Sequence, residues 1–456
     1  MSAHTDPVGA PASASAASAE GVPGPAPGPA PASAPAFAPS PDRAEFHPAA
    51  AYALALPSNP RPIVILGAGG IVRDAHLPAY RKAGYPVFGL YNRTIARAEA
   101  LAAEFGVERV FGSVAEAVAA APSDAVYDIA LMPEQYLEVL EQLPDGAPVL
   151  IQKPLGNHLA DGRAILELCR RKNLVAAVNT QLRFAPYVAA ARERIARGDI
   201  GELYDLEIRV QVNTPWQMFP HVLTLDRLEI NMHSVHYIDL VRSFLGNPES
   251  VAAVTVKHPA KAHANSRSDI ILYYPGRQIR VVISTNHDHD YGEKYEESYI
   301  KWEGTRGAIR AQMGLLLDYP TGGEDRLEVQ YDDDHAAGWQ PIPFEGSWFP
   351  DAFIGSMGAV QRFVGGDVSE LPTSVDDVFD TMAIVEAAYD SSAAGGIRPP
   401  YLAGGSHAGL DAQTDGRASA DREADPVVVA AAAPDANRHA TADADVDPNV
   451  EEEERI

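Results

Sequence analysis

The chain alternates short aliphatic runs with helical stretches between Pro62 and Val178, and this rhythm constrains its fold more than any other feature. Each run is long enough for one buried strand, and each interval is long enough for a helix. Strands joined in this way need crossover connections, which give a parallel sheet covered by helices on both faces. The strands are predicted at Ile63–Leu66, Val87–Leu90, Arg109–Phe111, Tyr127–Leu131, Val149–Ile151 and Leu174–Val178. The intervening helices are predicted at Asp74–Ala83, Thr94–Gly106, Val114–Ala121, Glu134–Leu143 and Ala160–Lys172.

The rhythm changes after Asn179, where longer runs alternate apolar and polar residues. Such alternation is typical of an antiparallel sheet with one buried face and one open face. The fold class is therefore predicted as α/β, with an N-terminal Rossmann domain followed by a C-terminal α+β domain whose open sheet is mostly antiparallel. The elements predicted in this second part are a helix at Tyr187–Arg197, strands at Tyr204–Val212, Val251–Val256, Ile270–Tyr274 and Ile279–Thr285, and a final helix at Val375–Ser391.

The two ends of the chain differ in composition from the part between them. Residues 1–58 are rich in Ala, Pro and Ser, and residues 403–456 form an acidic tail. Neither segment has enough apolar residues to offset the entropy cost of ordering, so both are predicted to be disordered. The folded part is then predicted to be the Rossmann domain at 59–180 and the α+β domain at 181–402.

The charge of the chain excludes some classes of partner. The formal net charge is −26 at pH 7, whereas binding to a nucleic-acid backbone needs clustered Lys and Arg. No run approaches the ~20 apolar residues of a membrane helix, and the N-terminal segment lacks the pattern of a secretory signal. The single cysteine, Cys169, rules out an internal disulfide and fits a reducing compartment. We therefore expect a cytoplasmic protein with no nucleic-acid or membrane partner.

A glycine-rich turn follows the first predicted strand, in the stretch VILGAGGIVRDAHLPAY at Val64–Tyr80. Gly67 allows a tight turn, and Gly69 allows backbone N–H groups at the start of a helix to approach a pyrophosphate. The third glycine of the usual fingerprint is replaced by Val72. Because the turn lies between a strand and a helix, we expect it to bind a dinucleotide rather than to be a bare turn. The cofactor-binding residues predicted here are Gly67, Ala68, Gly69, Gly70, Ile71 and Val72.

The second strand leads into Asn92 and Arg93. An acidic residue at this place would bind the ribose 2′-OH and repel a 2′-phosphate, whereas a neutral amide followed by a cation suits that phosphate. The pair therefore favours NADP over NAD, although Arg93 could also be an ordinary solvated loop residue. The sequence is compatible with either cofactor, NADP or NAD.

Two further motifs identify a family. The stretches VLIQKPLG at Val149–Gly156 and MHSVHYIDLVRSFLG at Met232–Gly246 lie downstream of the glycine turn. Together with it they resemble the Gfo/Idh/MocA oxidoreductases, the superfamily of glucose–fructose oxidoreductase and inositol dehydrogenase. RGDIGELYDLEI at Arg197–Ile208 and EGTRGAI at Glu303–Ile309 are similar to the family's second domain. The resemblance extends over about Pro62 to Pro400.

The first motif implies a role for Lys153. In the family, a Glu-Lys-Pro sequence supplies a lysine that reaches substrate and nicotinamide, and the matching residues here are Gln152, Lys153 and Pro154. Sheet geometry agrees with this role, because a lysine at the carboxyl end of a parallel strand points into the crevice where ligands bind. The glutamine in place of glutamate removes any charge that the acid would lend to the lysine. Lys153 is predicted to be catalytic and to touch the cofactor.

The second motif implies a catalytic histidine, His236, three residues before Asp239. Read as a helix, this segment has an apolar face with Val235, Ile238, Val241 and Leu245, and a polar side with His233, His236 and Asp239. With Asn231 as the predicted N-cap, both histidines lie in the first turns. There the helix dipole favours neutral imidazole, the state that a general base needs.

The family often carries an aspartate four residues before this histidine, where the chain has Met232. Either His233 or a residue elsewhere takes that role, or the chemistry differs. His233 and Asp239 are possible substrate contacts. So are Gln181 and Arg183, which follow the last parallel strand and could equally dock the two domains. In NHDHDYG at Asn286–Gly292 the side chains alternate between two faces of a strand, so no metal site is predicted there.

The resemblance implies an NAD(P)-dependent oxidoreductase that transfers a hydride between nicotinamide and a sugar, polyol or sugar acid. It also implies a homo-oligomer, a dimer or tetramer, formed through the open face of the second sheet. A redox-neutral sugar enzyme, such as a glycosidase or epimerase that recycles its bound cofactor, is the second possibility. A non-catalytic NAD(P)-binding regulator is the third.

Overall fold

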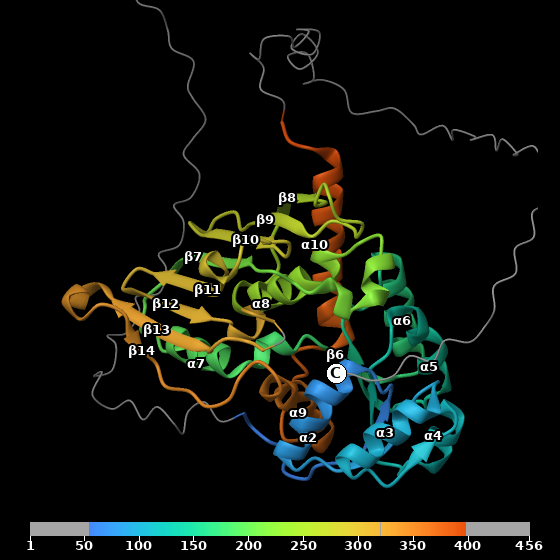
Figure 1. The fold of residues 1–456 in the computed structure, drawn as a ribbon. Coiled ribbons are helices and arrows are strands. Elements are labelled where there is room, and N and C mark those ends of the chain that lie inside the picture. Colours follow the sequence, from blue (N-terminus) through green and yellow to red (C-terminus); the bar gives the residue numbers. More distant parts are fainter. Residues whose placement is uncertain (1–53, 320, 398–456) are drawn as a thin grey trace, which may run out of the picture. The chain divides into compact units, whose positions relative to one another are not determined.

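The protein, described here from a computed structural model over residues 54–319 and 321–397, contains two β-sheets (Figure 1). The first sheet has six strands in the order β3-β2-β1-β4-β5-β6, and every neighbouring pair is parallel. This order confirms the predicted doubly wound sheet. Its strands are β1 (Ile63–Leu66), β2 (Val87–Tyr91), β3 (Val110–Phe111), β4 (Val126–Ile129), β5 (Pro148–Gln152) and β6 (Val175–Asn179).

Helices cover both faces of this sheet because each strand buries side chains on both sides. Ile63 and Ile65 of β1 belong to one apolar cluster, and Val64 and Leu66 belong to another. The first cluster contains α2 (Leu77–Ala83), α3 (Ile95–Phe105) and α9 (Asp351–Gly365). The second contains α4 (Val114–Ala120), α5 (Tyr136–Gln142) and α6 (Leu159–Arg171). Helix α9 was not predicted, and it reaches this sheet from late in the chain.

The second sheet has eight strands in the order β14-β13-β12-β11-β7-β10-β9-β8. All pairs are antiparallel except β10 with β7, so the prediction of a mostly antiparallel sheet is confirmed. Its strands are β7 (Leu203–Gln211), β8 (Ser250–Val256), β9 (Arg267–Tyr273), β10 (Arg280–Asn286), β11 (Glu297–Gly304), β12 (Gly307–Gln312), β13 (Arg326–Tyr331) and β14 (Gln340–Pro341).

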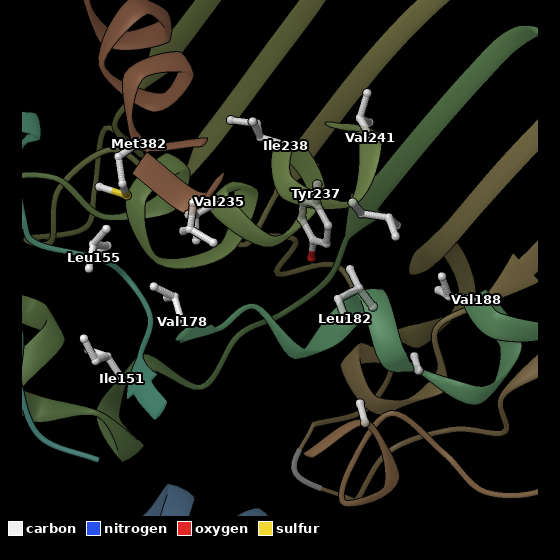
Figure 2. Packing of buried hydrophobic residues seen from close by; sticks show 14 of the residues in the cluster. Ile151, Leu155, Val178, Leu182, Val188, Val235, Tyr237, Ile238, Val241 and Met382 are labelled. Atoms are coloured by element: carbon white, nitrogen blue, oxygen red, sulfur yellow. The ribbon is translucent and has the colours of Figure 1, made fainter. Parts of the chain in front are cut away.

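One face of the second sheet packs against helices α7 (Pro186–Ala196), α8 (Val235–Leu245) and α10 (Val375–Ala394). The apolar face predicted for α8 is confirmed, because Val235, Ile238, Val241 and Leu245 are all buried. Figure 2 shows Val235 beside Met382 of α10 and Val178 of β6, with Ile238 and Val241 farther along α8. The core of the second part therefore continues into that of the first.

The other face of this sheet is open. Cross-strand partners on β8 and β9 place Val254, Val256, Ile271 and Tyr273 on it, and all four side chains are exposed. Farther along, Arg280 of β10 pairs with Asp205 and Glu207 of β7. The alternating strands predicted one buried face and one open face; that the open face has apolar side chains at one end was not predicted.

Two helix starts differ from the predictions. The helix expected from Asp74 begins earlier, with the π-helical turn η2 (Val72–His76) ahead of α2. Asn231, predicted as an N-cap, instead lies inside the π-helical turn η7 (Ile230–Ser234) that precedes α8, so that prediction is wrong. The helix gains an extra turn upstream, and Glu229 takes the position before it.

Most of the two segments predicted to be disordered lies outside the described residues. The last residues of the first segment are described, and there Ser58 donates a hydrogen bond from its backbone N–H to Asp367 Oδ2 at 2.8 Å. Within the described part of the chain, no helix is both long and apolar enough to cross a bilayer.

Candidate active site

Two glycines of the turn, Gly67 and Gly69, differ in the space around them. At Gly67 the backbone φ is +129°, and a Cβ there would lie 2.2 Å from the carbonyl oxygen of Ala130, so only glycine fits. At Gly69, in contrast, a Cβ would meet no atom within 4 Å. A helix begins directly afterwards, at Gly70. The turn therefore leaves open space at a helix N-terminus, which is the cradle that a pyrophosphate needs.

The other residues of the turn have structural contacts. Val72, in the place of the third glycine, is fully buried in the apolar cluster under the sheet. The N–H groups of Val72 and Arg73 both donate to the carbonyl of Gly69, at 3.0 and 3.2 Å. Ala68 is buried, while Gly70 and Ile71 are more open. The valine is thus accommodated in the core and leaves the open side of the turn unobstructed.

The turn is anchored by a buried polar cluster. His76 lies in η2, and its Nδ1 is 2.7 Å from Asp128 Oδ2 on β4. The hydroxyl of Tyr80 donates to the same carboxylate oxygen, also at 2.7 Å. None of the three side chains is exposed. This cluster fixes the segment after the glycine turn to the strand beside β1.

Asn92 and Arg93 follow β2 and have different roles in the structure. Asn92 Oδ1 accepts a hydrogen bond from the backbone N–H of Ala68 at 3.2 Å, and its Nδ2 donates to Thr94 O at 2.9 Å. The amide therefore holds the glycine turn in place. Arg93 is exposed, and among the described residues its guanidinium has no hydrogen-bond or ion-pair partner. Its charge is available to an anion.

Lys153 follows the last residue of β5 and links the two parts of the protein. Its Nζ donates a hydrogen bond of 2.6 Å to the carbonyl oxygen of Met232 in η7. Burial lowers the pKa of this ammonium to about 8. Gln152, where the family has glutamate, accepts a 2.9 Å bond from Asn179 Nδ2. Its amide is therefore engaged with the neighbouring strand.

His236 lies in the first turn of α8, buried and 5.9 Å from the ring of Trp348. Burial, with the nearby charge of Lys153, lowers the pKa of His236 well below its ordinary value. Its Nδ1 is enclosed and has no hydrogen-bond partner within the described residues. The ring is therefore neutral at pH 7, as a proton acceptor must be.

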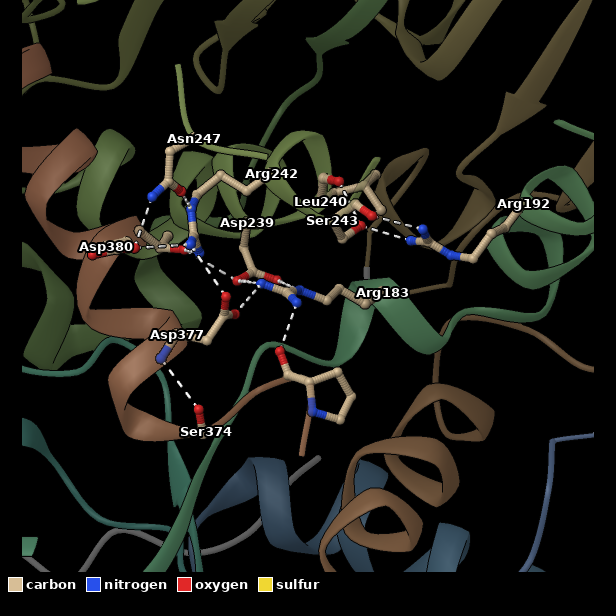
Figure 3. A network of polar contacts seen from close by, with 12 residues as sticks. Arg183, Arg192, Asp239, Leu240, Arg242, Ser243, Asn247, Ser374, Asp377 and Asp380 are labelled. Atoms are coloured by element: carbon tan, nitrogen blue, oxygen red, sulfur yellow. Dashed lines mark hydrogen bonds and ion pairs between the residues drawn. The ribbon is translucent and has the colours of Figure 1, made fainter. Parts of the chain in front are cut away.

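Arg183 was predicted either to contact substrate or to dock the domains, and Asp239 was predicted to contact substrate. Figure 3 shows them in one network, in which the guanidinium of Arg183 forms two bonds to the Asp239 carboxylate and one to Asp377. Asp239 also accepts from Thr381, at 3.1 Å. These contacts join the segment after β6 to α8 and α10, which all belong to the second predicted domain, so the network holds that part of the chain together. Gln181 is buried nearby on the same segment, with Oε1 unpaired within the described residues.

His233 has a partner that the sequence did not indicate. Its ring stacks on that of His287, with centroids 4.1 Å apart and an interplanar angle of 20°. Trp216 lies against both rings, at 5.6 and 6.0 Å. Sequence reasoning treated His287 as part of a strand, but β10 ends at Asn286. No local pattern marks this pairing, because the residues come from distant segments.

Asp288, the next residue, belongs to a polar cluster that shares Trp216 with this stack. Its carboxylate accepts bonds from Lys261 at 2.9 Å and from Trp216 Nε1 at 3.1 Å, and His263 lies 3.2 Å away. His289 is instead near Tyr291. Among the described residues, no group of three or more His, Cys, Asp or Glu side chains could hold a metal ion.

Comparison with known proteins decides the family. A sequence model described as "Oxidoreductase family, NAD-binding Rossmann fold" matches residues 61–180, and one described as "GFO/IDH/MocA C-terminal domain" matches residues 188–310. The chain belongs to the Gfo/Idh/MocA oxidoreductase family. The resemblance inferred from the motifs is thereby confirmed, and with it the expectation of a nicotinamide-dependent oxidoreductase fold.

Several members of the Gfo/Idh/MocA family are similar along most of the folded chain. D-apiose dehydrogenase of Rhizobium rhizogenes is 24% identical over 316 residues, which are 68% of this chain and 89% of that protein. D-xylose 1-dehydrogenase (NADP(+)) 2 of Haloferax volcanii is 24% identical over 267 residues, 57% of this chain and 78% of that one. An Agrobacterium radiobacter oxidoreductase, solved with NAD+, L-tartaric acid and magnesium, superposes with a TM-score of 0.62 at 21% identity, covering 74% and 97% of the two chains.

Proposed function

We propose that this protein is an NAD(P)-dependent dehydrogenase or reductase that acts on a hydroxyl or carbonyl group of a sugar, polyol or sugar acid. The observation that carries the proposal is the contact between Lys153 and Met232, 2.6 Å long. It brings the lysine at the end of β5 beside the turn that leads into His236. The names of the relatives, dehydrogenases of apiose and xylose, support the class of substrate.

Each group has a defined task in this reaction. When bound, the nicotinamide accepts or returns the hydride. Neutral His236 takes the proton of the substrate hydroxyl during oxidation and returns it during reduction. The ammonium of Lys153 donates a hydrogen bond to the reacting oxygen of the substrate. This bond orients the reacting carbon toward the nicotinamide and stabilises the negative charge that develops on the oxygen. The open part of the glycine turn, at Gly69 and Gly70, binds the pyrophosphate.

We propose NADP as the preferred cofactor. The cationic side chain of Arg93 is exposed and unengaged among the described residues, and no acid stands beside it at the end of β2 to bind a ribose hydroxyl. Because the side chain of Asn92 is already bonded to the backbone of Ala68, Arg93 is the residue that determines the preference between NADP and NAD. NAD is the alternative cofactor. Substitution of Arg93 distinguishes the two, because it should weaken the binding of NADP and leave the binding of NAD unchanged.

We propose further that the protein is a cytoplasmic homo-oligomer. The exposed apolar side chains on β8 and β9 give the open sheet face a surface that a second copy can cover. Light scattering on the full chain tests this, and a monomer at micromolar concentration would refute it.

The function is tested by following nicotinamide absorbance with NAD⁺ and NADP⁺ across aldoses, polyols and aldonates. We expect turnover that Lys153→Ala and His236→Ala reduce by at least about a hundredfold. Lys172→Ala is the matched control, because its Nζ contacts Glu141 O and Asp145 Oδ1 at the far end of α6, away from Lys153 and His236. Cofactor binding without turnover by the wild type would indicate the redox-neutral enzyme or the regulator instead.

A further inference from the structure

A row of aromatic rings connects His236 with the polar cluster behind the glycine turn. Trp348 meets the ring of His236 edge to face, with centroids 5.9 Å apart and an interplanar angle of 87°. Trp348 meets Phe349 in the same manner at 5.9 Å, and Phe349 meets Phe353 at 4.9 Å. The ring of Phe353 in turn lies 4.9 Å from that of His76. Ring contacts therefore join α8 to the turn η2, which follows the glycine turn.

The segment that carries Trp348 is fastened from both parts of the protein. The backbone N–H of Trp348 donates to Oδ2 of Asp325, directly before β13, at 3.3 Å. One residue earlier, the backbone N–H of Ser347 donates to Asp351 Oδ2 at 2.9 Å. Asp351 also forms an ion pair with Lys82 of α2. The place of Trp348 is therefore set from the second sheet and from a helix of the first.

Trp348 encloses one side of the imidazole of His236. The two residues are 4% and 5% exposed. Aromatic rings prefer offset or edge-to-face contacts, so the indole favours a limited set of orientations for the imidazole. A large apolar ring at this place also keeps water away from that side of the histidine. Exclusion of water disfavours the charged form of an imidazole, which is the form that cannot accept a proton.

The charged groups around His236 separate the effect of burial from that of charge. Burial first, and then the charge of Lys153, lowers the pKa of His236, and His233 in η7 is coupled to it. From the other elements packed on α8, Arg183 and Asp377 form an ion pair with each other. With a pKa of about 8, Lys153 keeps its charge at acidic pH. A change in the titration of His236 at low pH therefore reports a change in the burial of its ring.

We propose that Trp348 is a positioning residue for His236: its indole holds the imidazole in the orientation that accepts the substrate proton, and it excludes water from the ring. This inference rests on the proposed function, in which His236 is the base. The contacts that continue through Phe349 and Phe353 set the position of this base relative to the dinucleotide turn.

The test compares the pH dependence of sugar oxidation in variants of Trp348. Trp348→Leu keeps an apolar side chain and removes the ring. We expect it to lower kcat about 10- to 100-fold, with KM and the Kd of the cofactor within about threefold of the wild type. Protonated His236 is inactive, so kcat/KM falls as the pH drops through its pKa. In Trp348→Leu this fall should move up by about one pH unit, toward about 6.5, because water reaches the ring.

Two further variants show whether the effect belongs to the indole. Trp348→Phe keeps an aromatic ring, so its kcat and its acidic fall should lie between those of Trp348→Leu and the wild type. Phe244→Leu is the matched control. Phe244 also lies on α8, but its ring packs on Trp302 and under Arg192. The control should leave kcat and the pH profile unchanged.

A kcat within about threefold of the wild type in Trp348→Leu would overturn the inference, and so would a loss of kcat with an unmoved acidic fall. If Trp348→Leu does not fold, Trp348→Met takes its place, because its longer apolar chain fills more of the space, and the same results decide. A wild type that oxidises no sugar contradicts the proposed function. The ring of His236 is then titrated by NMR, with His236→Gln to assign its signal. A higher midpoint in the Trp348 variant supports the inference, and equal midpoints overturn it.

Discussion

Replacing Asp239 by alanine should destabilise the protein without abolishing substrate binding. Asp239 is buried, and it accepts two bonds from Arg183 and one from Thr381 (Figure 3). Its removal leaves the guanidinium of Arg183 without its main counter-ion. Arg183 keeps Asp377 at 2.7 Å and the carbonyl of Pro372 at 2.8 Å, so the charge is not left wholly unpaired.

The magnitude follows from these contacts. Removing one partner of a buried ion pair costs about 3–5 kcal/mol, and the two remaining contacts place this substitution at the low end, about 3 kcal/mol. In a chain of this size each kcal/mol lowers the melting temperature by roughly 2 °C, so we expect a fall of about 6 °C. Asp239→Asn keeps the shape and one acceptor oxygen, and it should cost less.

The assay is calorimetric melting of the full chain, together with KM for a turned-over sugar. Asp380→Asn is the matched control, because Asp380 contacts Arg242 and Asn247 at the exposed rim of the same network. An exposed contact is worth about 0–1 kcal/mol, so the control should melt within about 2 °C of the wild type. If Asp239→Ala melts like the wild type while KM rises tenfold or more, the structural role inferred from its bonds is wrong and Asp239 contacts substrate.

Three further predictions concern the first sheet and its site. Gly67→Ala forces a Cβ within 2.2 Å of Ala130 O at a positive φ, so we expect loss of dinucleotide binding in a fluorescence titration; unchanged affinity would contradict the strained turn. Because the pKa of Lys153 is lowered to about 8, the lysine is protonated below that pH and neutral above it. We expect kcat/KM to fall above pH 8, and we expect Lys153→Arg to shift this fall to higher pH. If the fall stays at the same pH in Lys153→Arg, it reports the titration of another group. Asp128→Asn weakens the bonds from His76 and Tyr80, and should lower the free energy of unfolding in urea by about 1–3 kcal/mol; an unchanged midpoint would count against the cluster.

Much of the fold follows from local sequence. Strand β1 of the first sheet (Ile63–Leu66) is an aliphatic run whose four side chains are all buried, and such runs are recognisable without neighbours. Helix α9 is different, because it contains Gly355 and Gly358, which lower helix propensity. A Cβ on Gly355 would lie 2.5 Å from Phe184, so close packing requires the glycine. The requirement for glycine comes from packing against a distant segment, so the local sequence pattern does not reveal it.

Some residues of the candidate site could likewise be predicted from the sequence, whereas the contacts of others could not. Lys153 and the glycine turn could be predicted because both follow strands of a parallel sheet, whose carboxyl ends lie at one edge. His236 came from a helical pattern and a family motif. The stack of His233 on His287 joins η7 to the end of β10, and no spacing in the sequence encodes it. Likewise, only the fold shows that Arg183 is engaged by Asp239.

The central claim is that a hydride passes between substrate carbon and nicotinamide in a site built from Lys153 and His236. The most direct measurement uses a sugar deuterated at the reacting carbon, with mass spectrometry and NMR of the recovered cofactor. We expect a reduced nicotinamide that carries the deuterium at C4, and no labelled cofactor with His236→Ala. Deuterium that appears only in a released sugar product, with no net reduced cofactor, would contradict a dehydrogenase and establish redox-neutral chemistry.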